Sequence, residues 1–398
     1  MIRKRTIGSR LMVIDMNVDI LFAIGILLLF AKVFGEITER LKMGSLIGEV
    51  TGGIIAGPLL GIVTPDPFIA ELAGFGILFF LFLVGLQTRF EEVKGNIYSS
   101  SFLAVMGALL SFLAGFVIGY IVFNDVLIGA VIGMALTATS DVVPIRSLMD
   151  IGELNTKIGK MVVAVNLADD VVAILSMSIL TTFLSLGAVR VWEISILFFA
   201  IIGFFLVILT FGSKVVGRFL TMFQTMRDEY MLLSVPLIVM FIVVYASEHI
   251  VLAGVVGAFL AGMAMSKSSI TEPVIIPKVK TVGYGFFIPL FFAYSAIAIN
   301  LGAMNMAMLF VITLLVIGAI AGKYIGVGFF SAYYKFKKED RRILGISMIP
   351  RGEYTIIIGQ LALASAVINS SIYTALIFTA LITIIITPMA LRMVRKKA

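Results

Sequence analysis

The 398-residue chain contains no cysteine and only one histidine, His249. Disulfides, thiol chemistry and cysteine-ligated metals are therefore excluded, and a lone histidine makes no histidine-rich metal centre. Charged residues are also scarce, at 13% of the chain. Because the sequence offers neither a thiol, a metal-ligand cluster nor a Ser-His arrangement, it gives no indication of an enzyme, and we expect no cofactor.

Long apolar runs recur throughout the chain, and 61% of its residues are hydrophobic. About 20 apolar residues are needed to cross a hydrocarbon layer of about 30 Å. The runs are apolar on every face, which excludes the alternating strands of a membrane β-barrel. The sequence therefore predicts an all-α polytopic membrane protein, in which the net charge of +7 reflects loop orientation rather than nucleic-acid binding.

The apolar runs predict thirteen transmembrane spans. They lie near residues 17–39, 44–63, 69–88, 96–123, 125–150, 157–187, 192–221, 229–247, 250–267, 281–300, 304–334, 342–368 and 371–394. If the last span ends in the cytoplasm, Arg190 is the one basic residue of the connecting loops that lies outside. The positive-inside rule then predicts a cytoplasmic C-terminus and an outside N-terminus. The basic tail of residues 1–15 does not fit this orientation unless translation starts at Met12 or Met16.

Two of these spans are interrupted by a proline beside polar residues. The fifth carries Thr139, Ser140 and Asp141 before Pro144, and the twelfth carries Pro350, Arg351 and Glu353. Proline removes a backbone donor, and irregular backbone at membrane depth survives only where protein or a water-filled cavity satisfies it. The sequence therefore predicts broken helices near 125–150 and 342–368.

The two interruptions are seven spans apart, which is an odd offset. Equivalent units would then have opposite topology, as expected for two inverted repeats, spans one to six and eight to thirteen, joined by the seventh span. Paired interrupted segments of this kind indicate a transporter binding site. Two unrelated proline kinks are the alternative.

The segment 162–175 places Asn166, Asp169 and Asp170 in an apolar run. Ionisable side chains are costly at membrane depth and mark ion or proton pathways. Neighbouring helical residues point about 100° apart, so one aspartate can line a pathway while the other meets a neighbouring helix. Asn166 shares a face with both, because it precedes them by three and four residues.

These residues suit exchange of a proton for a hard monovalent cation. Desolvation and mutual repulsion favour the neutral acid, so the two aspartates should titrate as a coupled pair. We expect this cation to bind at Asp170 and Asp169. Oxygens of Asn166, Thr139 and Ser140 would assist, although a hydroxyl in a membrane helix more often bonds to its own preceding turn.

Lys323 lies twelve residues before the first loop lysine, Lys335. Twelve residues span about 18 Å of helix, too far for the side chain to reach the interface. Lys323 therefore needs a buried partner, for which the carboxylate that does not face the ion is the candidate, unless it reaches a deep aqueous funnel. At the broken helices, Asp141 suits the positive helix ends and Arg351 the negative ends, and Glu353 either shares this role or forms a salt bridge with Arg351.

At these residues the chain resembles sodium/proton antiporters of the monovalent cation:proton antiporter superfamily, specifically its second family. The resemblance covers nearly the whole chain. It rests on Gly57-Pro58, 81-LFLVGL-86 with Arg89, the Thr139-Ser140-Asp141 break, 166-NLADD-170, Gly322-Lys323 and 350-PRGE-353.

The resemblance implies that Asp170 binds the cation and the proton, and that Asp169 pairs with Lys323, a pattern associated with electrogenic exchange of two protons for one Na⁺. It also implies a homodimer that works as an elevator. Residues 1–63 and 192–267 would be mostly dimerisation or scaffold helices, and 69–187 and 281–368 mostly a mobile core that holds the crossed broken helices.

We therefore expect a secondary Na⁺ or Li⁺/proton antiporter of the cell membrane, with the lipid bilayer and a second copy of the chain as partners and with no organic substrate. The nearest alternative is a K⁺/proton antiporter or a potassium-efflux type of transporter. A channel would conduct without proton coupling, and a bile-acid type of sodium symporter would need a pocket for an organic solute.

Overall fold

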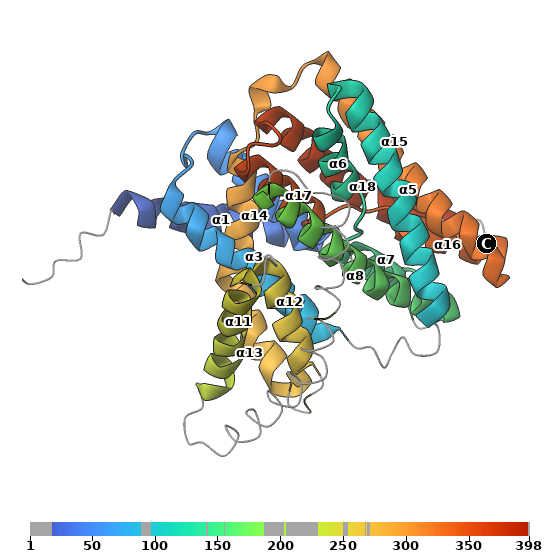
Figure 1. The fold of residues 1–398 in the computed structure, drawn as a ribbon, viewed down its shortest axis with the longest axis horizontal. Coiled ribbons are helices and arrows are strands. Elements are labelled where there is room, and N and C mark those ends of the chain that lie inside the picture. Colours follow the sequence, from blue (N-terminus) through green and yellow to red (C-terminus); the bar gives the residue numbers. More distant parts are fainter. Residues whose placement is uncertain are drawn as a thin grey trace, which may run out of the picture.

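The computed structural model describes residues 18–88, 97–140, 142–154, 156–186, 203, 230–249, 254–266, 268 and 271–396. All regular structure in these segments is helical (Figure 1). Eight helices are long and apolar enough to cross a membrane, and four shorter apolar helices accompany them. The all-α prediction is therefore confirmed.

A helix occupies each predicted span that the described residues cover, and the seventh span is not among them. That span, 192–221, lies almost entirely outside the described residues, so the count of thirteen remains a prediction. The tenth span begins earlier than predicted. Its helix runs without interruption from Thr271 to Ile297 through π-helical and α-helical stretches, because Pro277 and Pro289 each lie in the first turn of an α-helical stretch.

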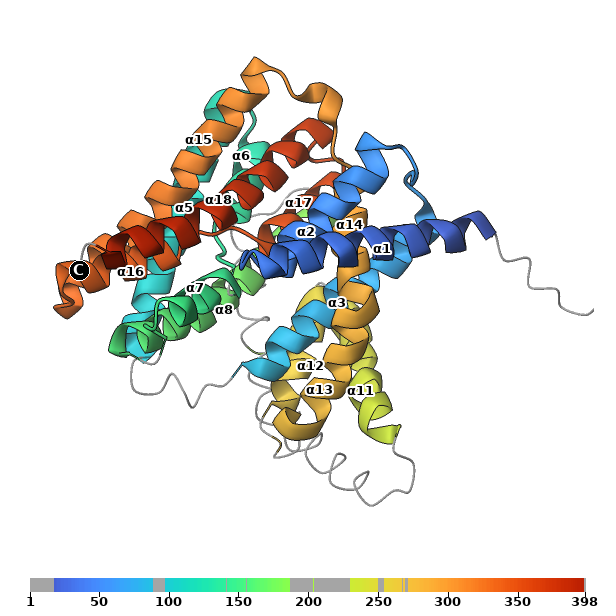
Figure 2. The same cartoon turned by 180° about the vertical axis from the view of Figure 1, so that it is seen from behind.

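One group of helices combines the first three spans with the eighth, ninth and tenth. Within it α1 packs on α2, α2 and α3 on α14, and α3 and α11 on α12 (Figure 2). The members are α1 (Val18–Arg40), α2 (Ser45–Ile54) with the π-helix η1 (Ile55–Leu59), α3 (Pro67–Gln87), α11 (Met231–His249), α12 (Gly254–Met265), η3 (Thr271–Ile275), α13 (Ile276–Val282), η4 (Gly283–Phe287) and α14 (Ile288–Ile297).

The other group combines spans four to six with spans eleven to thirteen. Here α5 packs on α6, α8 and α15, and α18 packs on α15 and α17. The members are α5 (Ile97–Phe123), α6 (Val126–Ala135), α7 (Val142–Asp150), α8 (Lys157–Leu186), α15 (Met306–Lys323) with η6 (Tyr324–Phe329) and η7 (Phe330–Tyr334), α16 (Lys338–Ser347), α17 (Glu353–Ala364) and α18 (Ser370–Lys396). The 3-10 turn η5 (Leu301–Ala303) connects the two groups.

The two halves of the chain therefore contribute in the same order, their first three spans to the first group and their last three to the second. Inverted repeats produce this arrangement. By these contacts α3 and residues 281–297 pack with α1, α2 and α12, whereas the resemblance implies that they belong mostly to the core. The division into scaffold and core stays a prediction. Composition does not distinguish these helices, because α3 and α14 are as apolar as α5 and α15 of the other group.

Both predicted broken helices are present. The fifth span separates into α6 and α7, and the twelfth into α16 and α17, with unwound backbone between them. Pro350 lies in the second gap, but Pro144 does not break the fifth span, contrary to the prediction. It lies in the first turn of α7, where a backbone N–H has no acceptor within the helix.

Glycines set the closest helix crossings. A Cβ atom built on Gly85 of α3 would lie 2.1 Å from the carbonyl oxygen of Phe259, and one on Gly262 of α12 would lie 2.2 Å from that of Phe82. The glycine-rich segment from Gly48 to Gly61 also packs closely, because a Cβ on Gly53 would lie 2.0 Å from the Ala293 carbonyl oxygen. Small residues allow membrane helices to approach closely.

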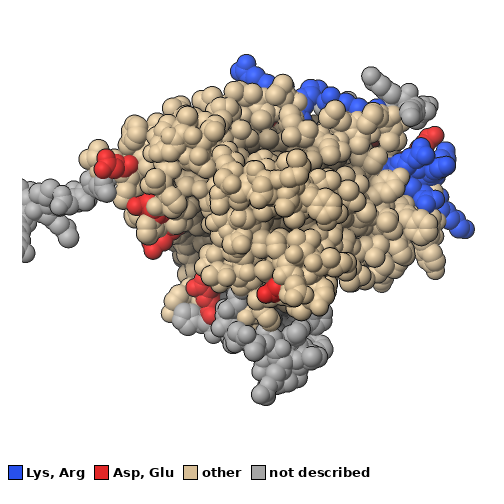
Figure 3. All heavy atoms as spheres, turned by 90° about the horizontal axis from the view of Figure 1, so that it is seen from above, with Lys and Arg blue, Asp and Glu red and all other residues tan. Residues whose placement is uncertain are grey.

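Charges divide between the two ends of the helices. Acidic residues stand where α1, α3 and α6 begin, at Asp19, Asp66 and Asp125, and the last two accept N-cap hydrogen bonds. Basic residues gather at the opposite ends of the membrane helices, for example Arg40 in the last turn of α1 and the cations at the start of α16. Figure 3 shows most Lys and Arg on the right and upper edge of the molecule and Asp and Glu on the left.

Replacing Gly85 by Ala should destabilise the protein by about 1–3 kcal/mol, because α3 and α12 must separate to admit the methyl group. The matched control is Gly74→Ala on the same helix, where the new Cβ would meet nothing within 4 Å. Thermal unfolding of the purified protein in detergent measures both. Equal melting midpoints for the two variants would contradict the close crossing.

Candidate functional site

The two broken helices cross at their unwound segments. The backbone N–H of Ser140 donates to the Pro350 carbonyl oxygen at 2.9 Å, and the Thr139 hydroxyl donates to that of Met348 at 3.2 Å. The Thr355 hydroxyl on α17 donates to the Ala135 carbonyl at the end of α6 at 2.7 Å. Side chains and facing backbone therefore satisfy polar groups that the broken helices release, as irregular backbone in a membrane requires.

Asp169 of α8 receives two kinds of donor at this crossing. Its Oδ1 forms an ion pair with the Lys323 ammonium group, and its Oδ2 accepts from the backbone N–H of Thr139 at 2.8 Å. Lys323 is completely buried and Asp169 is 2% exposed. Both charges are thus compensated by a direct contact, which buried ions need.

The position of Lys323 follows from the small residues around it. A Cβ on Gly322 would lie 2.6 Å from the Cα of Ser111, and one on Gly107 would lie 3.1 Å from the Lys323 Cδ. The aliphatic stem of the lysine therefore lies against α5, and no larger residue fits beside it. Directly after Lys323 the helix changes to the π-helix η6, an irregularity that is frequent at functional sites.

Arg351 occupies the gap between α16 and α17. Its guanidinium donates to the carbonyl oxygens of Ala138 at 2.9 Å and Ala319 at 3.0 Å. Longer bonds of 3.4 Å run to the hydroxyls of Thr139 and Ser111. Since Ala138 follows the C-terminal end of α6, the positive charge lies where the helix dipole is negative, as expected from the sequence.

Asp170 and Asn166 lie one turn apart on α8, at 3% and 2% exposure. Neither amide atom of Asn166 makes a hydrogen bond within the described part of the chain. A buried amide without partners is costly in an empty site. Asn166 therefore has donor and acceptor capacity available for a ligand beside the Asp170 carboxylate.

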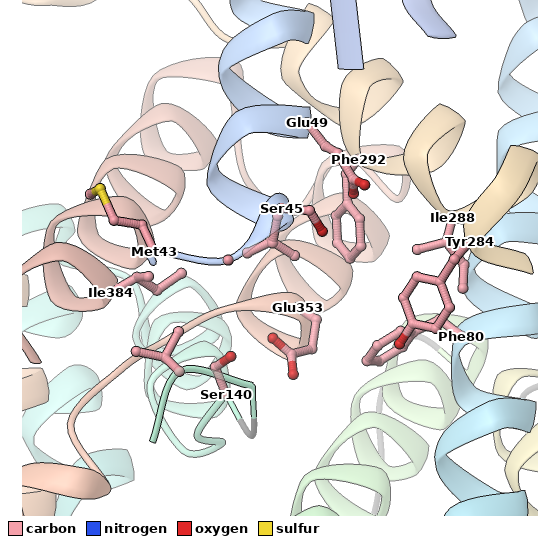
Figure 4. Close-up of a pocket in the computed structure, with 13 residues that line it drawn as sticks. Met43, Ser45, Glu49, Phe80, Ser140, Tyr284, Ile288, Phe292, Glu353 and Ile384 are labelled. Atoms are coloured by element: carbon pink, nitrogen blue, oxygen red, sulfur yellow. The ribbon is translucent and has the colours of Figure 1, made fainter. Parts of the chain in front are cut away.

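A small cavity of about 50 Å³ lies between the two groups of helices (Figure 4). Glu49 and Ser45 of α2 face it from one side, and Glu353 and Ser140 face it from the other. The space is sufficient for a water molecule. Glu353, the first residue of α17, also places its carboxylate at the positive end of that helix.

The structure thus brings together most of the residues selected from the sequence. Thr139 and Asp169 are in contact, Arg351 contacts Thr139, and Asp170 and Asn166 lie on the same helix as Asp169. Ser140 and Glu353 lie at the adjoining cavity. Asp141 lies outside the described residues, so its charge-compensating role stays a prediction.

Four further residues were not selected from the sequence. Ser111 and Thr355 bond to the broken helices, and the Thr383 hydroxyl of α18 accepts the backbone N–H of Arg351 at 2.9 Å. The fourth residue is Glu49, which lines the cavity. An acid within a glycine-rich apolar helix was the signal available for Glu49, whereas serine and threonine hydroxyls are too common in membrane helices to be selected without the fold.

Comparison with known proteins agrees with this architecture. Residues 25–397 match the family described as sodium/hydrogen exchanger, transmembrane. The Na⁺/H⁺-K⁺ antiporter GerN of Bacillus cereus is 29% identical over 378 residues, which cover 95% of this chain and 96% of GerN. The probable Na⁺/H⁺ antiporter GerT of the same organism is 31% identical over 358 residues, covering 89% and 94%.

The fold is similar to that of the sodium proton antiporter MjNhaP1 from Methanocaldococcus jannaschii. The superposition has a TM-score of 0.73 and covers 95% of this chain and 99% of MjNhaP1, at 17% sequence identity. At this identity the likeness concerns the fold. It confirms the predicted architecture of membrane helices.

Replacing Lys323 by Met should destabilise the protein by about 3–5 kcal/mol, because it leaves Asp169 charged and buried without its partner. Adding Asp169→Asn to that variant should recover much of the loss, since no uncompensated charge remains. Thermal unfolding of the single and double variants measures the coupling. Lys280→Met is the control, because Lys280 is exposed in the last turn of α13, where a surface substitution costs little. Additive effects of the two core substitutions would contradict the ion pair.

Thr383→Val should cost about 1–3 kcal/mol by leaving the backbone N–H of Arg351 buried without an acceptor. Thr383→Ser should restore the stability. Thr379→Val on the same helix is the matched control, since the Thr379 hydroxyl is equally buried and donates to Ala375 of its own helix. The melting midpoints decide the question, and an equal loss in both valine variants would argue against the role of Thr383.

Proposed function

Because the chain belongs to the sodium/hydrogen exchanger family, we propose that it exchanges Na⁺ or Li⁺ for protons across the cell membrane at the Asp169 and Asp170 pair. The observation that carries this proposal is the buried pair itself, with Lys323 on one acid and the unsatisfied amide of Asn166 beside the other. Members of such a family are multi-pass transporters rather than enzymes.

Exchange follows from competition for one set of oxygens. An ionised Asp170 binds the cation together with oxygens of Asn166, Thr139 and Ser140, whereas protonation removes the negative charge that holds the cation. Oxygen ligands are the ones that hard cations prefer. Asp170 therefore carries either a proton or the cation, and release of one permits binding of the other.

The Asp169–Lys323 pair makes each exchange cycle move net charge across the membrane. When the cation recruits Asp169, the ion pair opens and Lys323 can release a proton, so more than one proton leaves for each Na⁺. Net charge then crosses the membrane, and each elementary charge is worth about 2.3 kcal/mol per 100 mV. Membrane potential would help to drive Na⁺ out of the cell.

The two groups of helices supply a route for alternating access. The group that holds the broken helices, α5 to α8 and α15 to α18, is the mobile core, and the group of α1 to α3 and α11 to α14 is the scaffold and dimer interface. The core moves as an elevator once the site is neutralised. The small cavity between Glu49 and Glu353 lies at the boundary of the two groups and provides a polar step for the cation.

Charge distribution supports one orientation. Basic residues at the ends of α1, α16 and α18 would face the cytoplasm, and the acidic N-caps at Asp66 and Asp125 would face outside. The C-terminus is then cytoplasmic and the N-terminus outside. Each protomer would pair with a second copy in the bilayer.

Exchange of K⁺ for protons is the second candidate. The relative GerN is named an Na⁺/H⁺-K⁺ antiporter, so K⁺ belongs among the cations to be tested. A channel would show cation flux without proton coupling. The buried lysine at the site disfavours a simple cation pore, because it repels the ion.

Asp170→Asn should abolish cation-dependent proton flux while the protein remains folded, because the amide neither ionises nor carries the exchanged proton. The measurement is dissipation of a pH gradient in proteoliposomes on adding Na⁺, Li⁺ or K⁺, with the membrane potential clamped or free. Asp125→Asn is the control, since asparagine caps a helix about as well as aspartate.

Full exchange by Asp170→Asn would disprove the site. A response of the unmodified protein to K⁺ alone would move the function to the second candidate. Cation flux without a change of pH would indicate a channel.

A further inference from the structure

A basic cavity lies at the end of the second helix group, away from the aspartate site. It has a volume of about 270 Å³ and lies between η6 and α16. Its lining consists of two aromatic residues, one glycine and three cations, namely Tyr324, Phe329, Gly328, Lys338, Arg341 and Arg342. Neither the ion pair at Asp169 nor the crossing of the broken helices uses these side chains.

The helices η6 and α16 are in close contact beside the cavity. A Cβ on Gly328 would lie 3.2 Å from the Gly345 Cα, so the helices are in contact at these two glycines. Near this contact the Nε of Arg341 donates to the Gly328 carbonyl oxygen at 3.3 Å. This bond fixes the guanidinium at the wall of the cavity and leaves its two terminal nitrogens available.

The charge of the cavity is strongly positive. Lys338 and Arg342 are exposed and Arg341 is partly buried, so all three can reach an anion without large desolvation costs. Lys335 and Lys337 precede them. Glu339 and Asp340 lie in the same first turn of α16 but do not line the cavity. Arginine binds phosphate oxygens through two parallel hydrogen bonds, and lysine adds a point charge.

Apolar residues adjoin the cations on the outer face. Phe329 is 62% exposed and Ile325 is 47% exposed, and both belong to the helical stretch from Met306 that crosses the membrane. Lys335 follows only six residues after Phe329. The cations therefore stand at the level where a membrane-crossing helix ends, directly beside side chains that suit acyl chains.

We propose that this cavity binds the headgroup of an anionic phospholipid of the cytoplasmic leaflet. The phosphate lies between Arg341, Arg342 and Lys338, and the acyl chains run along Phe329 and Ile325. Basic pockets at the cytoplasmic ends of membrane helices bind lipid headgroups in this way. A lipid can contact the cations and the adjoining Phe329 and Ile325 together, whereas a soluble anion contacts the cations alone.

The test is lipid-dependent stability of the purified, delipidated protein. We expect phosphatidylglycerol or cardiolipin to raise the melting midpoint by roughly 5 °C, because a ligand that binds only the folded state stabilises it. Phosphatidylcholine and inorganic phosphate should produce little change. Native mass spectrometry should find the anionic lipid retained on the protein.

The variants locate the effect. Arg342→Gln, at an exposed position, and the double variant with Arg341→Gln should lose both the shift and the retained lipid. Lys280→Gln, an exposed basic position in the last turn of α13, should keep both. Since Arg342 is exposed, its single variant keeps the inference falsifiable if the double variant does not fold.

Three results would overturn the inference. A lipid effect that persists in Arg342→Gln and in the double variant would place the lipid elsewhere. An equal shift with phosphatidylcholine would remove the charge requirement. An equal shift with inorganic phosphate would assign the cavity to a free anion. None of these readouts depends on transport, so the lipid inference and the proposed exchange are tested independently of each other.

Discussion

The buried ion pair between Asp169 and Lys323 is the constraint on which the site depends. Removing an ion from water costs several kcal/mol even after relaxation, so each of these charges requires the other. The glycines of α5 and α15 allow the lysine to pass between the helices, and the Thr139 N–H supplies the second donor to Asp169. The close helix packing and the unwound backbone therefore both support the ion pair between Asp169 and Lys323.

The two buried cations near the broken helices, Arg351 and Lys323, differ in their roles. Arg351 is held by backbone carbonyl oxygens at the negative end of α6, and its own N–H is held by Thr383 on α18. The Arg351 cation therefore has a structural role. Lys323, by contrast, has a carboxylate partner that a cation can recruit. Asp170 and the amide of Asn166 lie beside that partner, so a change at either acid alters the balance of the whole site.

The depth of polar residues within the predicted membrane spans was enough to predict much of this arrangement. The distance of Lys323 from the nearest loop indicated a buried partner, and the polar residues around Pro350 indicated unwound backbone in the twelfth span. Pro144 was misleading, because proline is also favourable in the first turn of a helix. Helix geometry left open which aspartate meets the lysine, since residues 169 and 170 differ only in direction around the helix axis. The resemblance implied Asp169, and Asp169 forms the ion pair.

Other features depend on tertiary contacts that no local pattern encodes. The place of α3 and α14 in the first helix group follows from close crossings with α12 and α2, and their composition resembles that of every other span. Thr383 is one of several buried threonines on α18, and only the position of the Arg351 N–H distinguishes it from Thr379. Glu49 and Glu353 line one cavity from distant parts of the chain.

The most direct test of the account is to count the protons released when Na⁺ is added to the purified protein in weakly buffered solution. Competition at Asp169 and Asp170 predicts saturable release of more than one proton for each Na⁺ bound, and binding of Na⁺ without release of protons would contradict it.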